Sequence, residues 1–170
     1  FSSSYHCIEL PLVHEIEESM NAWMTESQKN YAAKRKQEYL AGRYCAKKAC
    51  EKINVSLNSL PMADDRSPIW PEGIVGSISH THGLAIAAVS DELFAIGLDA
   101  ETMIEDARFD KIKRLIVTDE EISKFNQISF APTLIFSAKE ALYKTLHPKC
   151  KEYFGFLEAT VDEIGTDTFS

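Results

Sequence analysis

The spacing of hydrophobic and polar positions changes along the chain, and these changes predict a mixed order of helices and strands. Good helix formers without Gly or Pro predict an early helix, and apolar positions three and four apart predict two later helices. Alternating apolar positions separated by turn residues predict strands. The early helix is predicted to include residues 30–41, and the two later helices to cover 108–117 and 133–146. The predicted strands cover 74–78, 84–89, 93–101 and 153–164. This order indicates an α+β protein.

Shorter signals predict where elements begin and end. Residues 61–71 carry three prolines and a polar turn, which predicts a linker. Thr118 and Glu121 form a capping-box pattern that opens a further helix. Pro148 predicts the end of the helix over residues 133–146. No apolar run reaches the roughly 20 residues of a membrane span, and the first residues lack the pattern of a signal peptide. We therefore expect a cytoplasmic protein with no membrane span.

Charge is unevenly distributed along the chain. The 170 residues carry a net charge of −8, but residues 29–52 hold eight basic side chains against two acidic ones, a local charge of +6. At about 100° per residue, Lys36, Arg43 and Lys47 fall on one helix face. The face is either a solvated surface or an anion site, since Arg and Lys both bind phosphates. Nucleic acid is disfavoured as a partner, because the acidic remainder of the surface would repel it.

Two carboxylates lie two residues apart in the segment 97–101. If this segment is a strand, Asp99 and Glu101 lie on the same face, about 7 Å apart, and Phe94 lies on the opposite, buried face. Two carboxylates on one side can share Mg²⁺, which prefers oxygen ligands, and a third acid nearby would complete such a site. A polar, solvent-facing strand edge is the alternative interpretation.

The predicted helix 133–146 carries a second charged pair, Glu140 and Lys144. Their spacing of four residues is typical of a surface ion pair. If the helix faces Asp99, Glu140 is instead a third metal ligand or a general base, and Lys144 contacts a phosphate.

The segment 76–83 contains His80 and His82, separated by one residue. Such a pair is compatible with the start of a zinc site, with one anion-binding histidine beside an exposed one, or with a structural role. The four cysteines form no Cys-x-x-Cys pair that would support zinc, and we expect them to be free thiols.

Together these segments resemble the 4′-phosphopantetheinyl transferases, in particular the siderophore-associated type, over residues 34–147. Residues 97–101 resemble the family motif Gly-Ile-Asp-x-Glu, and Lys139, Glu140 and Lys144 match its Lys-Glu-x-x-x-Lys helix. Residues 76–80 resemble the family's Ser-His segment, and residues 38–43 resemble the helix motif of the siderophore type. Each motif alone is short, and their common order makes the resemblance specific.

The resemblance implies a fold of two similar α+β halves that form a pseudo-twofold monomer with the site between them. We expect residues 1–96 to form the half with the basic helix and the Ser-His segment, and 97–170 the half with the carboxylates. Relatives continue with more strand beyond Ser170, so we expect the second half to be truncated at its C-terminus.

The resemblance also implies a reaction. The enzyme would transfer 4′-phosphopantetheine from coenzyme A to a serine of an apo acyl, peptidyl or aryl carrier protein, and leave adenosine 3′,5′-bisphosphate. It would need Mg²⁺ or Mn²⁺ and would act in siderophore or other nonribosomal peptide biosynthesis. The carrier would dock on residues 125–130 or on the basic helix.

Site residues follow from the resemblance position by position. The implied metal ligands are Asp99, Glu101 and Glu140. The implied contacts to coenzyme A are Arg43, Lys47, Ser79, His80 and Lys144. Glu140 would also take the serine proton, and Lys144 would neutralise charge on the phosphates. Lys34, Arg35 and Lys36 match the family only by their basic character, and we treat them as secondary candidates for contacts to coenzyme A.

Two alternatives remain at this point. A non-catalytic relative would bind coenzyme A or a carrier domain without transfer, although all three carboxylates are present here. A zinc hydrolase would use His80 and His82, bind zinc tightly and be indifferent to coenzyme A.

Overall fold

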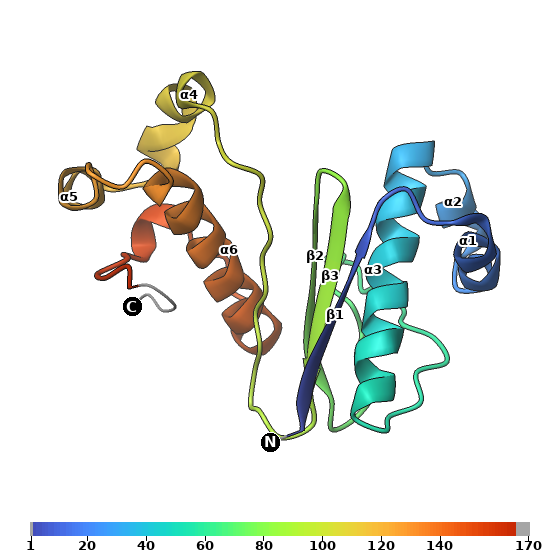
Figure 1. The fold of residues 1–170 in the computed structure, drawn as a ribbon. Coiled ribbons are helices and arrows are strands. Elements are labelled where there is room, and N and C mark those ends of the chain that lie inside the picture. Colours follow the sequence, from blue (N-terminus) through green and yellow to red (C-terminus); the bar gives the residue numbers. More distant parts are fainter. Residues whose placement is uncertain (1, 166–170) are drawn as a thin grey trace. The chain divides into compact units, whose positions relative to one another are not determined.

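The computed structural model describes residues 2–165. The chain divides into two compact units, Phe1–Ala100 and Glu101–Ser170 (Figure 1). The boundary between these units lies four residues after the one expected from the sequence, within the segment that carries Asp99.

The first unit is an antiparallel sheet covered on one face by a long helix. Its strands are β1 (Ser3–Glu9), β2 (Val75–Thr81) and β3 (Leu84–Ser90), and its helices are α1 (His14–Asn21), α2 (Glu26–Lys29) and α3 (Ala33–Lys52). The sheet order is β1-β3-β2, and α3 packs against all three strands while α1 packs against α3 (Figure 1). The predicted pair β2–β3 and the basic helix are confirmed, whereas β1 was not anticipated.

Small residues allow α3 to approach the sheet closely. Ala85 and Ala87 of β3 are fully buried in one core cluster with Ala46 of α3. At Gly42, an added Cβ would lie 2.7 Å from Cγ2 of Ile78 on β2. Because Gly42 has no side chain, the side chain of Ile78 on the edge strand β2 packs directly against the backbone of the basic helix.

The prediction of a strand over residues 93–101, immediately after β3, is wrong. The backbone there makes its hydrogen bonds with side chains of the edge strand instead of with a backbone ladder. Leu98 N donates to Ser77 Oγ at 3.0 Å, and Ala100 N donates to Ser79 Oγ at 3.2 Å. Phe94, expected on a buried face, is 79% exposed. The segment is therefore held beside β2 in an irregular conformation.

The regular secondary structure in the described part of the second unit consists of helices. It contains α4 (Asp106–Ile116), α5 (Asp119–Lys124), α6 (Ala131–Cys150) and the 3₁₀ helix η1 (Phe156–Glu158). The capping box of α5 is confirmed, since Thr118 Oγ1 accepts from Glu121 N and Thr118 N donates to the Glu121 carboxylate. Helix α4 packs against α6 and η1, and α6 also contacts η1 (Figure 1).

Two sequence predictions for this unit are wrong. Helix α6 does not end before Pro148 but continues to Cys150, where Lys151 in a left-handed conformation donates its N–H to His147 O at 2.9 Å. Proline removes one donor without ending the helix at this position. The strand predicted over residues 153–164 is absent as well, and its Val161 N donates to the buried Glu121 carboxylate.

The structure thus mixes helices with an antiparallel sheet, as expected for an α+β protein. The sheet lies in the first unit, and over residues 101–165 the second unit contains no strand. Within the described part of the chain, no helix is long and apolar enough to cross a membrane.

Candidate functional site

His80 lies near the end of β2 and faces α3. Strand alternation places His80 on the same side as Ile78, and Ser79 on the opposite side. Arg35 Nη1 of α3 lies 3.0 Å from His80 Nε2. The Glu38 carboxylate lies 3.9 Å from His80 Nδ1 and 3.6 Å from Arg35 Nη1. One turn of the basic helix and the end of β2 thus form a charged cluster.

Arg43 is a buried cation further along the same helix. Its side chain is only 7% exposed, and its guanidinium carbon lies 3.9 Å from the centroid of the Tyr39 ring. Burial lowers the pKa of Arg43, and the interaction with Tyr39 opposes this effect. Within residues 2–165, Nε and Nη2 have no hydrogen-bond partner. Buried donors without partners are costly, so this arrangement suits an anionic ligand.

The other cations expected on this face are engaged elsewhere. Lys36 Nζ lies 3.3 Å from Glu17 of α1, and Lys47 Nζ lies 6.0 Å from the ring of Trp23. The cation that the structure brings to His80 is Arg35, which we had treated as secondary. The sequence does contain a feature that could have indicated Arg35. It lies seven residues, or about two helical turns, before Gly42, and therefore on the side of α3 that approaches the sheet.

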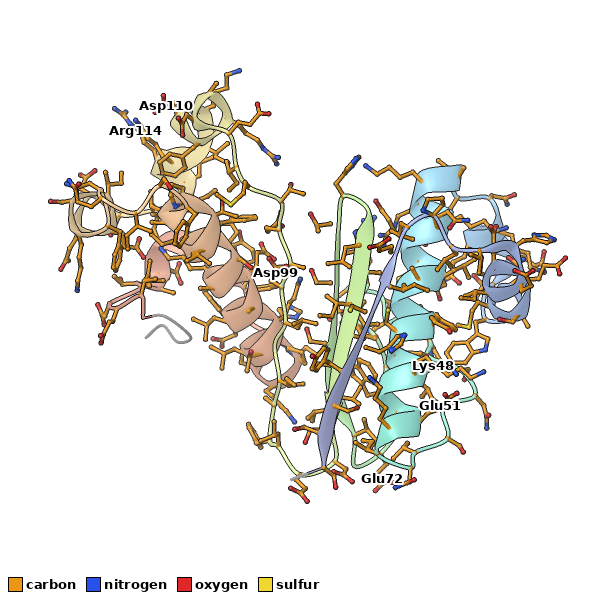
Figure 2. All side chains as sticks on the ribbon, viewed as in Figure 1. Lys48, Glu51, Glu72, Asp99, Asp110 and Arg114 are labelled. Atoms are coloured by element: carbon orange, nitrogen blue, oxygen red, sulfur yellow. The ribbon has the colours of Figure 1, made fainter. Side chains whose placement is uncertain are left out.

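Asp99 is held by the opposite face of β2. Ser79, which is 4% exposed, donates its hydroxyl to Asp99 Oδ1 at 2.9 Å. Asp99 itself is labelled in Figure 2. Ser79 therefore contacts the carboxylate and does not lie beside His80. The argument that placed Asp99 and Glu101 on one strand face is wrong, because the segment is not a strand. Asp99 is half-buried in the first unit, and Glu101 is exposed in the second.

Glu140 and Lys144 are half-buried on α6. Glu140 lines a hollow of about 180 Å³ whose remaining wall is mostly aromatic. The lining residues are Lys139, Glu140, Tyr143, Tyr153, Phe154 and Phe156. Charged and apolar groups thus meet in one concave site, which is typical of ligand pockets.

Lys139, the first residue of the Lys-Glu-x-x-x-Lys motif, has a structural environment. Its ammonium is 2% exposed and donates to Glu121 Oε2 at 2.8 Å and to Ile116 O at 2.9 Å. Burial alone would raise the pKa of Glu121, but hydrogen bonds from Lys139 and from the backbone of Thr118 and Val161 outweigh it and lower the pKa. The pair joins α6 to α5, immediately before Glu140. Sequence analysis missed it because Glu121 was explained by its capping role alone.

Over residues 2–165, no group of three or more His, Cys, Asp or Glu side chains is arranged to hold a metal ion. His80 contacts α3, and His82 is exposed at the turn between β2 and β3. The four cysteines are free thiols, as expected. The carboxylate trio Asp99, Glu101 and Glu140 is divided between the two units, so its role in metal binding stays a prediction.

Comparison with protein families identifies the class. Residues 25–90 match the model of the 4′-phosphopantetheinyl transferase N-terminal domain, and residues 95–170 match that of the 4′-phosphopantetheinyl transferase superfamily. The chain belongs to the 4′-phosphopantetheinyl transferase superfamily. The family predicted from the four motifs is confirmed.

Individual relatives narrow the comparison. The chain is 38% identical to enterobactin synthase component D of Salmonella typhimurium over 117 residues, which cover 65% of this chain and 48% of the relative. It is 30% identical to the 4′-phosphopantetheinyl transferase PptT of Mycobacterium tuberculosis over 133 residues, or 76% of this chain and 59% of the relative. The chain therefore spans about half the length of the relatives that it matches.

Proposed function

We propose that this protein transfers 4′-phosphopantetheine from coenzyme A to the side chain of a serine on an apo carrier protein. The serine Oγ forms a bond to the pyrophosphate phosphorus that carries pantetheine. The bond from that phosphorus to the bridging oxygen breaks, and adenosine 3′,5′-bisphosphate leaves. The serine proton passes to a base, so the products are the holo carrier and the bisphosphate.

One observation carries the proposal within the first unit. The hydrogen bond from Ser79 to Asp99 joins the Ser-His segment to the carboxylate motif, although they lie 20 residues apart. Family membership and the unpaired donors of buried Arg43 support the proposal independently. A site that binds coenzyme A needs cations for its phosphates and carboxylates for a metal, and the motifs supply both.

We assign the carboxylates Asp99, Glu101 and Glu140 to a magnesium site, with manganese as a substitute. An all-carboxylate donor set suits this hard cation, and the hydrogen bond from Ser79 fixes the direction of one of its members. When bound, the metal would neutralise charge on the pyrophosphate.

The remaining site residues act directly on the reactants in this proposal. Glu140 takes the serine proton, and Lys144, one helical turn later, neutralises charge that develops on the phosphate oxygens. His80, Arg43 and Lys47 contact the phosphates of coenzyme A. The half-buried setting of Glu140 and Lys144 supports these roles, since partial exclusion of water strengthens electrostatic interactions.

Finer features of the proposal rest on the family and on relatives' names. We propose that the units form two similar halves of a pseudo-twofold monomer, with the active site between them. We propose peptidyl or aryl carrier domains of siderophore or other nonribosomal synthesis as substrates, since enterobactin synthase component D is among the relatives. The expected location is the cytoplasm.

Intact mass spectrometry of an apo peptidyl carrier domain tests the reaction. The domain is incubated with the full chain, coenzyme A and Mg²⁺, and a parallel sample contains a chelator. We expect a gain of one phosphopantetheine in the sample with metal only. Glu140→Gln should abolish the gain, whereas Glu120→Gln, an exposed control on α5, should not. Binding of coenzyme A without any mass gain across several carriers would refute the transferase and favour the non-catalytic alternative.

A further inference from the structure

Ser77 is a buried polar residue of β2 to which the proposed function gives no role. Its side chain is 4% exposed, and strand alternation places it on the same side of β2 as Ser79. Ser77 Oγ accepts a hydrogen bond from Leu98 N at 3.0 Å, and it also lies 3.5 Å from Leu98 O. A buried hydroxyl without a partner is costly, and here the backbone of a segment 21 residues later supplies the partner.

Ser77 and Ser79 together take the place of a strand partner for the segment that carries Asp99. Ser79 Oγ accepts from Ala100 N at 3.2 Å, so the two serines hold backbone donors on either side of Asp99. Two residues along a strand span about 7 Å, and the two donors of the segment also lie two residues apart. The pair of hydroxyls therefore fixes the register of this segment beside β2.

The two serines act on Asp99 in different ways. Ser79 donates its hydroxyl to Asp99 Oδ1 at 2.9 Å and so contacts the carboxylate itself. Ser77 holds Leu98, the residue directly before Asp99. Leu98 O and Asp99 N belong to one planar peptide group, so a restraint on Leu98 limits the backbone rotations that would turn the carboxylate away.

We propose that Ser77 is a positioning residue for the metal site to which we assigned Asp99. For the identity of the ligand, a divalent cation, this inference rests on the proposed function. The Asp99 carboxylate lies between two anchored residues and is directed before the metal binds. A ligand that is already oriented loses less conformational freedom on binding, so removal of the Ser77 hydroxyl should weaken metal binding without any contact between Ser77 and the metal.

A purely structural role for Ser77 is the alternative, and Ser90 of β3 offers a matched comparison. Ser90 is 1% exposed, and its Oγ accepts from Glu92 N at 3.2 Å and from Leu93 N at 3.1 Å. Ser90→Ala thus removes a buried hydroxyl that holds the backbone of a following segment, as Ser77→Ala does. The residues held by Ser90 lie several positions before Asp99, so this variant leaves the support of the carboxylate in place.

Electron paramagnetic resonance of Mn²⁺ measures metal binding without a carrier or a transfer step, because the signal of the free ion falls as it binds. The full chain is titrated with Mn²⁺ in the presence of coenzyme A, and coenzyme A alone serves as the blank. The variants are Ser77→Ala, which removes the hydroxyl, and Ser77→Thr, which keeps it. The residue paired with Ser77 in the sheet is the small, half-buried Ala88. Ser90→Ala is the control, and urea unfolding gives the stability of each variant.

We expect Ser77→Ala to weaken Mn²⁺ binding about tenfold, a typical effect for a residue that orients a metal ligand. Ser77→Thr should bind Mn²⁺ like the wild type. Ser90→Ala should lose stability to urea as Ser77→Ala does, but it should keep the wild-type affinity. Hydrogen exchange should rise at Leu98 and Ala100 in Ser77→Ala, and at Leu93 in Ser90→Ala. Should Ser77→Ala fail to fold by circular dichroism, Ser77→Cys, whose thiol is a weak acceptor, decides.

Three results would overturn the inference. Wild-type affinity for Mn²⁺ in Ser77→Ala would mean that Ser77 has only a structural role. Equal losses of affinity in Ser77→Ala and Ser90→Ala would mean a general effect of destabilisation. A loss in Ser77→Thr as large as that in Ser77→Ala would mean that the hydroxyl is not the cause.

Failure of this inference and failure of the proposed function are distinguishable. Mn²⁺ binding that depends on Ser77, together with no transfer in the mass assay, would refute the proposed function and leave this inference intact. Transfer by the wild type, together with unchanged Mn²⁺ binding in Ser77→Ala, would refute this inference alone. A wild type that binds no Mn²⁺ would refute the metal site and this inference together.

Discussion

Replacement of Lys139 by Met is expected to destabilise the helical unit strongly, although Lys139 belongs to a motif associated with catalysis. Its ammonium is buried and donates to Glu121 Oε2 at 2.8 Å and to Ile116 O at 2.9 Å. Methionine keeps most of the volume of lysine but removes the charge and both hydrogen bonds. The carboxylate of Glu121 would then remain buried without its counter-charge.

The expected loss in the free energy of unfolding depends on which hydrogen bonds to the Glu121 carboxylate remain in the variant. Removing one partner of a buried ion pair costs about 3 to 5 kcal/mol. In Lys139→Met, the backbone N–H groups of Thr118 and Val161 still donate to the carboxylate, so we expect a loss of about 3 kcal/mol. Glu121→Ala leaves a buried ammonium and two unpaired N–H groups, so its loss should reach about 5 kcal/mol or more.

Urea unfolding followed by far-ultraviolet circular dichroism measures these losses. Hydrogen exchange in peptides from α6 shows whether the loss lies in the helical unit. Lys111→Met, the same change at an exposed position of α4, is the control and should alter the free energy of unfolding by less than about 0.5 kcal/mol. A loss below about 1 kcal/mol for Lys139→Met, or one equal to the control, would refute the buried-pair argument.

Three further predictions concern other contacts. Ser79→Ala removes the donor to Asp99, and we expect transfer to fall 10- to 100-fold, with a higher magnesium requirement in the carrier assay and a fold that is retained by circular dichroism. Because the pKa of Glu121 is lowered in the folded state, its contribution to stability is present above the unfolded value and is lost as the pH falls below about 4.3. Thermal unfolding across pH should show this acid loss, and Glu121→Gln should flatten it. Gly42→Ala places a Cβ 2.7 Å from Ile78, which should cost about 1 to 3 kcal/mol in urea unfolding, and a neutral effect would contradict the close approach of α3.

The correct sequence predictions concern features encoded over a few adjacent residues. The helices near 108–117 and 133–146, the pair β2–β3 and the capping box of Thr118 all follow from local spacing and side-chain chemistry, and the structure contains them. The ordered motifs likewise identified the family. Local propensity was enough because each of these elements satisfies its own hydrogen bonds or those of its nearest neighbour in the chain.

Predictions failed where distant residues supply the hydrogen bonds. Segment 93–101 has the alternation of a strand, but Ser77 and Ser79 of β2 hold its backbone through their hydroxyls. Residues 153–164 were predicted as a strand, yet Val161 N donates to the carboxylate of Glu121, 40 residues earlier. A residue's preference for a strand does not reveal whether a neighbouring strand or a side chain will accept its backbone donors.

Sequence alone determined the class of protein and the residue types of its site. Tertiary structure decided which of these residues meet. Helix periodicity pointed to Lys36 and Lys47 beside Arg43, but the close approach of α3 to β2 brings Arg35 and Glu38 to His80 instead. Strand alternation directs Ser79 away from His80 and toward Asp99. The physical reason is that spacing fixes directions within one element, whereas contacts between elements depend on how their buried faces pack.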